Sequence, residues 1–223
     1  MTKGKLIIIV LLVSMVLLAA SFVVLKGRIL KAAVYYNQIP IVQLLIDAGV
    51  DVNEDYGTEG TSLMVACLQG HEELVKLLIE KGADLDSQDS LGNNALTAAM
   101  EKGNTRIVKL LIAKGLDVKG SGSYGYSPLR VAAGLNRPDY VRLLLKAGAD
   151  PNATPPQGNS PLMETAQSGN LEITLILIEA GADINAKDYR GYTALTIAHE
   201  SGNKAVERLL IEKGADVSYR NIP

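Results

Sequence analysis

The fold of this chain is decided by the stretch Gly181-Ala-Asp-Ile-Asn-Ala-Lys-Asp-Tyr-Arg-Gly-Tyr-Thr-Ala-Leu-Thr-Ile-Ala198. Its first glycine is followed two positions later by an aspartate, and this pair recurs every 33 residues without an insertion. The glycines of the six pairs are Gly49, Gly82, Gly115, Gly148, Gly181 and Gly214. A period between about 20 and 50 residues is typical of stacked repeat proteins, so the sequence predicts a solenoid.

Each unit of this period carries two apolar clusters at helical spacing. The first cluster contains a leucine that occurs in every unit, and the second is a short aliphatic run such as Leu110-Leu111-Ile112. A hydroxyl that can cap free amides stands at the expected start of the first helix at Thr61, Ser127, Ser160 and Thr193. Pro128 and Pro161 fit the next position, because proline lacks an amide hydrogen. Turn-rich stretches such as 119–125 and 154–158 fit protruding loops. We therefore expect two short helices and one hairpin loop per unit.

This combination of helices, turns and period resembles the ankyrin repeat, most clearly in Gly191-Tyr-Thr-Ala-Leu-Thr-Ile-Ala198. The resemblance implies an all-α solenoid with short β-hairpin loops, formed by about six 33-residue units within residues 26–223. Two features depart from the family: no unit has the usual histidine after its signature leucine, and Glu59 replaces a recurring loop glycine. The expected units span residues 26–54, 55–87, 88–120, 121–153, 154–186 and 187–219.

The two ends of the array differ in sequence. Thr174 and Glu207 occupy a position that is valine in the earlier units, so the apolar face becomes polar toward the C-terminus. A polar outer face prevents the last unit of a solenoid from aggregating. We therefore expect the sixth unit to be a cap.

The N-terminal segment predicts a membrane anchor. After a short basic tail, residues 1–5, the segment 6–25 provides 20 residues without a charge. A helix of this length can cross a hydrocarbon core of about 30 Å. We expect a single-pass transmembrane helix or signal anchor in the lipid bilayer, with the repeats on the extracytoplasmic side. The alternative is a signal peptide cleaved after Ser21, which leaves a periplasmic or secreted protein.

The anchor and the array are very close in sequence. Leu25 ends the apolar run, and the first repeat helix is expected to begin by about Arg28. This gap is far shorter than a flexible linker, so an uncleaved anchor holds the array against the bilayer. We therefore expect a protein partner that is itself membrane-bound or close to the membrane surface.

Composition and motifs argue against several other functions. The formal net charge is −2, or −4 for residues 26–223, which gives no basic field for nucleic acid. The single cysteine, Cys67, cannot form an internal disulfide, and its mostly apolar column indicates a core position. His71 lacks a second histidine at metal-ligand spacing, and no phosphate loop or nucleophile motif occurs. We expect no catalytic residue, metal site, cofactor or small-molecule substrate.

The candidate binding surface is the concave side that the resemblance implies, formed by hairpin tips and first-helix surfaces. Tyrosine and arginine are enriched in binding hot spots, and the tips concentrate tyrosines in a chain that has nine of them and one phenylalanine. Alternatively, tyrosines suit hairpins and simply cover their neighbours. The candidate partner-binding residues are Leu91, Asn93, Tyr124, Tyr126, Gln157, Asn159, Tyr189, Arg190 and Tyr192.

The sequence thus predicts a non-catalytic protein–protein interaction module in the form of a membrane-tethered array. One alternative is a soluble exported protein that protects or inhibits a co-exported enzyme after signal cleavage. A second alternative is an enzyme whose site carries no recognisable motif, and this would require titratable groups that converge in a pocket.

Overall fold

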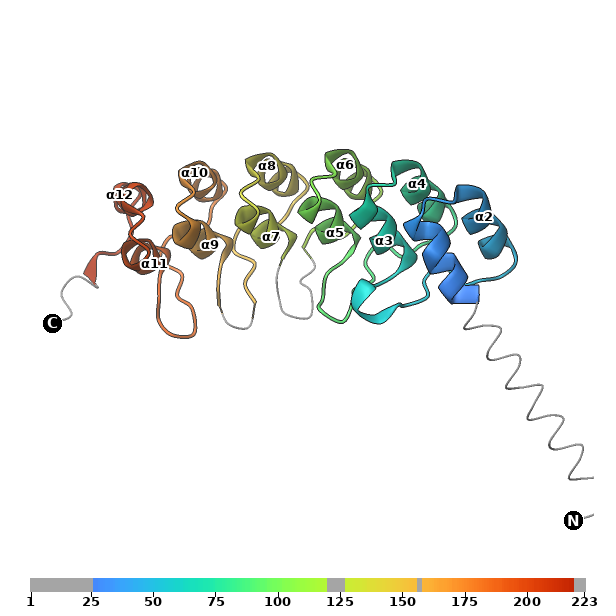
Figure 1. The fold of residues 1–223 in the computed structure, drawn as a ribbon. Coiled ribbons are helices and arrows are strands. Elements are labelled where there is room, and N and C mark those ends of the chain that lie inside the picture. Colours follow the sequence, from blue (N-terminus) through green and yellow to red (C-terminus); the bar gives the residue numbers. More distant parts are fainter. Residues whose placement is uncertain (1–25, 120–126, 156–157, 219–223) are drawn as a thin grey trace, which may run out of the picture.

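The computed structural model describes residues 26–119, 127–155 and 158–218, and its helices stack side by side along one axis (Figure 1). Residues 26–35 are helical, and a short 3-10 helix η1 (Gly57–Glu59) lies in the next loop. The remaining helices are α2 (Ile39–Asp47), α3 (Ser62–Gln69), α4 (Glu72–Glu80), α5 (Ala95–Glu101), α6 (Thr105–Ala113), α7 (Pro128–Gly134), α8 (Pro138–Lys146), α9 (Pro161–Ser168), α10 (Leu171–Glu179), α11 (Ala194–Glu200) and α12 (Lys204–Glu212).

The helices form two rows. In Figure 1, α3, α5, α7, α9 and α11 form an inner row from which the loops extend downward, and α4, α6, α8, α10 and α12 form an outer row above it. Each inner helix is followed by an outer helix after a tight turn. This arrangement confirms the prediction of a helical solenoid.

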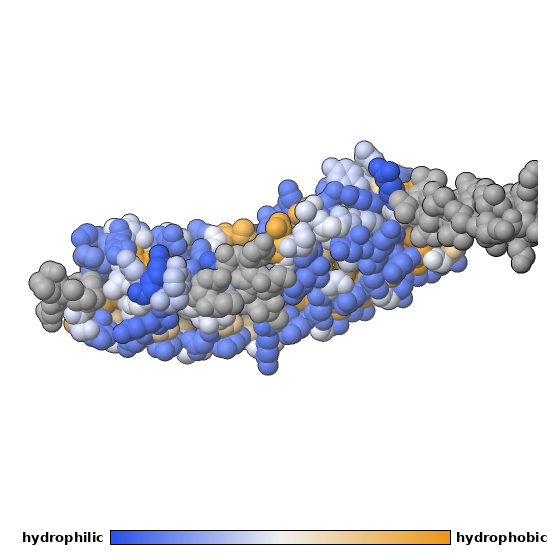
Figure 2. All heavy atoms as spheres, turned by 90° about the horizontal axis from the view of Figure 1, so that it is seen from below, coloured by the Kyte–Doolittle hydropathy of each residue, from blue (hydrophilic) through white to orange (hydrophobic). Residues whose placement is uncertain are grey.

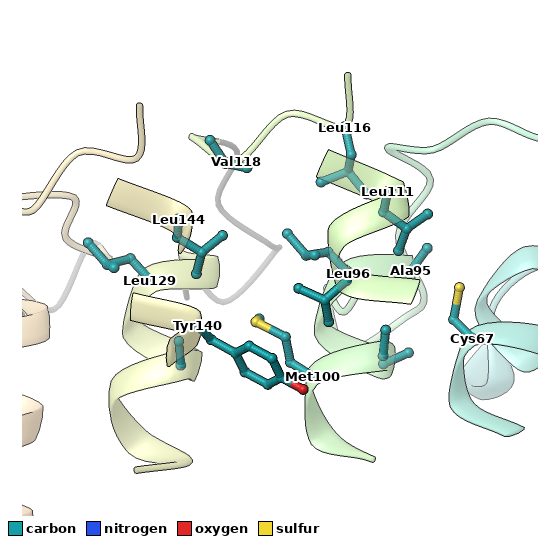
Figure 3. Close-up of a cluster of buried hydrophobic side chains, with 14 of the residues drawn as sticks. Cys67, Ala95, Leu96, Met100, Leu111, Leu116, Val118, Leu129, Tyr140 and Leu144 are labelled. Atoms are coloured by element: carbon teal, nitrogen blue, oxygen red, sulfur yellow. The ribbon is translucent and has the colours of Figure 1, made fainter. Parts of the chain in front are cut away.

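The core runs the length of the stack without interruption. The leucine that recurs in every unit is fully buried at Leu30, Leu63, Leu96, Leu129, Leu162 and Leu195. Burying one such side chain contributes roughly 1.5–3 kcal/mol, so this single column is a major source of stability. Figure 3 shows how Met100 and Tyr140 occupy the space between α5 and α7, where both side chains are buried.

Hydroxyl and amide side chains begin most of the inner helices. The Ser127 and Ser160 hydroxyls accept hydrogen bonds from the amides of Arg130 and Met163, as the sequence predicts. Thr61 was expected to act in the same way, but its hydroxyl is buried and has no hydrogen-bond partner within the part of the chain that the structure describes. The prediction of a side-chain cap at Thr61 is therefore wrong, although α3 still begins at the next residue.

The loops between helix pairs correct the expectation of short β-hairpins, because no strand occurs within the described ranges. In the loop before α5, the backbone of Asp89 and Asn93 forms one hydrogen bond of 2.9 Å. The Asp89 carboxylate accepts the amide hydrogens of Leu91 and Asn93, both at 2.8 Å. Because a side chain satisfies these amides, the loop closes as a turn and not as a β-ladder.

The C-terminal end is closed by polar groups that are themselves buried. Thr174 is fully buried, and its hydroxyl lies 2.6 Å from the carbonyl oxygen of Asn170. Glu207 is 7% exposed and contacts Nδ1 of His199 at 3.2 Å. The polar column therefore does not form the exposed face of a cap. In the last unit, the contact between His199 and Glu207 stands where the first unit has the buried residues Val34 and Val42.

Within residues 26–119, 127–155 and 158–218, no helix combines the length and the apolar character that a membrane span requires. The predicted span, residues 6–25, lies outside these ranges.

Candidate functional site

The candidate site is the surface made by the loops and the inner helices, which we call the loop face. Leu91 and Asn93 lie in the loop before α5, Asn159 lies just before α9, and Tyr189, Arg190 and Tyr192 lie in the loop before α11. Figure 2 looks onto this side of the molecule and shows a mainly hydrophilic surface with a few hydrophobic places. Three predicted site residues, Tyr124, Tyr126 and Gln157, fall outside the described residues.

An N-terminal recess of about 250 Å³ opens on the loop face between α3 and α5. Its lining includes the side chains of Met64, Val65 and Leu68 from α3, together with the predicted residues Leu91 and Asn93. Leu91 is 51% exposed, although a leucine gains free energy from burial. The recess therefore offers a small apolar surface with an exposed leucine beside it.

A C-terminal recess of about 220 Å³ opens on the same face between α9 and α11. It brings together three of the predicted residues, Asn159, Arg190 and Tyr192. Two carboxylates also line it: Glu164, which pairs with Arg130 at 2.7 Å, and Glu200, which is exposed. This recess is polar and carries both signs of charge, in contrast to the N-terminal recess.

The loop before α11 is held by the buried carboxylate of Asp188. Its Oδ1 accepts the amide hydrogens of Arg190 and Tyr192, both at 2.9 Å, and its Oδ2 pairs with the Arg190 guanidinium at 3.0 Å. Burial opposes ionisation of Asp188, but the amide and guanidinium hydrogen bonds outweigh it and lower the pKa of this carboxyl. The same contacts fix the positions of Arg190 and Tyr192 on the loop face.

Arg190 has a structural role that the sequence does not reveal. Its guanidinium lies 4.8 Å from the centre of the Tyr192 ring and 5.6 Å from that of Tyr189. The arginine is therefore engaged by Asp188 and by two aromatic rings before any partner binds. Tyr189, which is 74% exposed, is the member of this group that is most available for contact.

The sequence-based prediction considered mainly the hairpin tips and therefore missed several residues of the loop face. One position of the 33-residue period on the inner helices lines one of the two recesses in five units, at Tyr35, Leu68, Glu101, Gln167 and Glu200. The residue type at this position varies from unit to unit, while the core positions stay apolar. Variation against a constant core could have indicated this surface from the sequence.

Cys67 and His71 both have structural positions. Cys67 is fully buried, which confirms the predicted core role, and burial raises the pKa of its thiol. The His71 ring contacts the carbonyl oxygen of Tyr35 at 3.1 Å, and Asn104, one unit later, donates to the carbonyl oxygen of Cys67 at 2.8 Å. In the described part of the chain, no three His, Cys, Asp or Glu residues are grouped so as to hold a metal ion.

Comparison with protein families matches the chain to the model for ankyrin repeats (3 copies), over residues 17–89, 63–155 and 154–221. A comparison with curated proteins found no match. The matched ranges cover well over half of the sequence, and they coincide with the stacked helix pairs of Figure 1. This chain belongs to the ankyrin repeat family.

Proposed function

We propose that this protein is a non-catalytic interaction module that binds a protein partner through its loop face. The observation that carries the proposal is that two recesses of different chemistry open on one face. The loop that lines each recess also presents a strongly exposed apolar or aromatic side chain, Leu91 in one and Tyr189 in the other. Ankyrin repeats generally mediate protein–protein interaction. Large amphipathic side chains around a small recess are typical of binding hot spots.

The two recesses favour a partner that presents both apolar and charged groups. The N-terminal recess suits an aliphatic or aromatic side chain, because Met64, Val65 and Leu68 line it. The C-terminal recess combines Glu164, Glu200 and Arg190, and it suits polar groups of either sign. A folded protein surface or an extended segment that spans several units can supply such a combination.

The same proposal includes a membrane tether formed by residues 6–25, with the repeats on the extracytoplasmic side. The span is supported by the 20-residue uncharged run. Lys3 and Lys5 before the run are balanced by Lys26, Arg28 and Lys31 after it, so protease accessibility of the repeats from each side of the membrane tests the orientation. The mass of the mature chain distinguishes this proposal from its alternative. A chain of full-length mass in the membrane fraction supports the tether. A mass that corresponds to a chain beginning near Ser21 supports a cleaved, exported protein.

Site-specific photocrosslinking in the native host tests the loop face. A photoreactive phenylalanine analogue is placed at position 91 or 189, and at Leu171 on α10 as a control that is also exposed, at 46%, but lies in the outer row. We expect the same adduct from positions 91 and 189, its loss when excess unlabelled chain competes, and none from position 171. Adducts from position 171 alone contradict the proposal.

Substitution then tests the contribution of the aromatic side chains. In the double variant Tyr189→Ala and Tyr192→Ala, the yield of the adduct from position 91 should fall strongly, even though position 91 lies in another loop. We expect a loss of at least about 2 kcal/mol in binding, or roughly 30-fold in Kd. An unchanged helical circular dichroism signal is the control for folding. Undiminished capture by the double variant argues against a role for this loop.

A further inference from the structure

The first helix pair exposes apolar side chains on the end of the stack. We call Ile29, Ile41 and Leu44 the N-terminal end face; they are 42%, 43% and 69% exposed. The residues that stand at the position of Ile41 in later units are almost completely buried, at 0–2% exposure: Leu74, Ile107, Tyr140, Ile173 and Val206. Those residues pack between neighbouring helix pairs, so the end face is a stacking surface without a neighbouring unit in the described part of the chain.

The opposite end of the array is built differently. There, the contact between His199 and Glu207 replaces the buried valine pair Val34 and Val42 of the first unit. Glu207 is itself buried, but the exposed residues of α12 include the charged Lys204, Arg208 and Glu212, and charged groups at a terminal position suit contact with water. The asymmetry indicates that water covers the C-terminal end and that something apolar covers the N-terminal end.

The chain that precedes the end face suggests what covers it. The uncharged segment 6–25 ends one residue before the helical residues 26–35, so no linker separates the two. Along a helix, Ile29 lies only about 4.5 Å from Lys26, at 1.5 Å per residue. A bilayer that holds residues 6–25 therefore reaches the level of the end face.

The surroundings of the end face have the composition of a membrane–water interface. A recess of about 500 Å³ beside the helical residues 26–35 is lined by Arg28, Lys31, Ala32, Tyr35, Tyr36, Glu54 and Tyr56. The two tyrosine rings stack edge to face at 5.2 Å and are 48% and 69% exposed. Tyrosines at the headgroup level and a basic side chain such as Arg28 are typical of this layer, whereas Lys31 is already paired with Glu59 at 2.6 Å.

We propose that the N-terminal end face lies against the lipid bilayer, with Ile29, Ile41 and Leu44 in the interfacial layer. This inference rests on the membrane tether of the proposed function and adds an orientation to it. The array then extends away from the bilayer, with the His199–Glu207 end farthest from it. A second copy of this chain is a weaker candidate, because three partly exposed side chains fall far short of the roughly 800 Å² per partner of a standard interface.

Tryptophan fluorescence tests the inference cleanly because the chain contains no tryptophan. The full chain with Leu44→Trp is reconstituted into phosphatidylcholine–phosphatidylglycerol vesicles, with or without brominated acyl chains. Leu171→Trp is the matched control, because Leu171 is also exposed but lies on α10 near the other end of the stack. We expect a blue shift and loss of most of the emission in brominated vesicles for Leu44→Trp, and neither change for Leu171→Trp.

Vesicle flotation separates the possible failures. If both variants float with the vesicles and neither is quenched, the end face does not touch lipid and the inference is overturned, while the tether stands. If neither variant floats, the tether and the inference fall together. A Leu44→Trp blue shift that depends on protein concentration, without quenching, identifies a second copy as the occupant and also overturns the inference.

Discussion

The backbone amide of Asp183 donates a 2.7 Å hydrogen bond to the side-chain oxygen of Asn152, which lies in the preceding loop. Equivalent hydrogen bonds join Asn53 to Asp84, Asp86 to Asp117 and Asn185 to Asp216. Four pairs of neighbouring loops are therefore linked by a hydrogen bond to one polar side chain of the preceding loop. At the corresponding position in the third unit stands Lys119, whose side chain offers no acceptor.

The first prediction is that Lys119→Asn stabilises the array. Asparagine supplies the missing acceptor for the amide of Asp150, and a hydrogen bond of this kind contributes about 0.5–1.5 kcal/mol. Urea unfolding of the full chain in a mild detergent measures the change in the free energy of unfolding. Lys114→Asn is the control, because it removes the same charge at the end of α6 without supplying the acceptor. Equal effects of the two variants would contradict the hydrogen-bond account.

A second prediction concerns Gly158, where two loops approach closely. Its φ is +80°, and a Cβ atom there would lie 2.9 Å from Cα of Asp188 in the next loop. Gly181 has a φ of +90°, but a Cβ atom added to Gly181 would have no other atom within 4 Å. Gly181→Ala therefore measures the backbone strain alone. We expect Gly181→Ala to cost about 1–2 kcal/mol and Gly158→Ala to cost about 1–3 kcal/mol more. Equal losses in thermal or urea unfolding would show that the loops move apart without cost.

The third prediction is that Asp188 makes stability depend on acid pH. Its pKa in the folded chain is lowered, whereas an unfolded aspartate titrates near 3.9. The ionised carboxylate therefore stabilises the fold above about pH 4, and this contribution is lost as pH falls through the folded-state pKa. The difference in free energy of unfolding between the natural chain and Asp188→Asn should be constant above about pH 5 and shrink below about pH 4. A difference that does not vary with pH contradicts this assignment.

The fourth prediction uses Cys67 as a reporter of unit opening. The thiol is fully buried, and burial raises its pKa, so very little reactive thiolate is present at pH 8. We expect labelling by an aromatic disulfide reagent to be slow in the native chain and rapid in denaturant. Because Cys67 is the only cysteine, the labelling rate reports opening of the stack around α3. Labelling in seconds without denaturant would mean that this part of the core opens readily.

The local pattern of the chain was sufficient to predict the solenoid. Glycine at Gly70 and Gly169 marks the ends of α3 and α9, and the constant leucine marks the buried position of every unit. These features depend on residues that are close in sequence, because helix periodicity, capping and turn conformation are local. Asn37 and Asn136 take the place of the turn glycine with φ near +55°, and asparagine tolerates this conformation better than most residues.

The site was predicted only in part. The sequence placed Leu91, Asn93, Asn159, Tyr189, Arg190 and Tyr192 on loops, but it could not show which of them line a recess. It also could not show that Arg190 is held by Asp188, or that the loops are turns without strands. These properties depend on which side chain reaches a given amide or ring in three dimensions.

The sequence by itself therefore determined the repeat, the helix pairs and the core, because each follows from a periodic pattern of apolar and turn residues. Only the tertiary structure decided whether residues at the same position of the period are buried or exposed in the individual units. An isoleucine is exposed at Ile41 and buried at Ile107, because this position faces the preceding helix pair, which Ile107 has and Ile41 lacks within the described part of the chain. In a stacked array, the burial of a residue depends on whether a neighbouring unit packs against it. The sequence of a single unit does not carry this information.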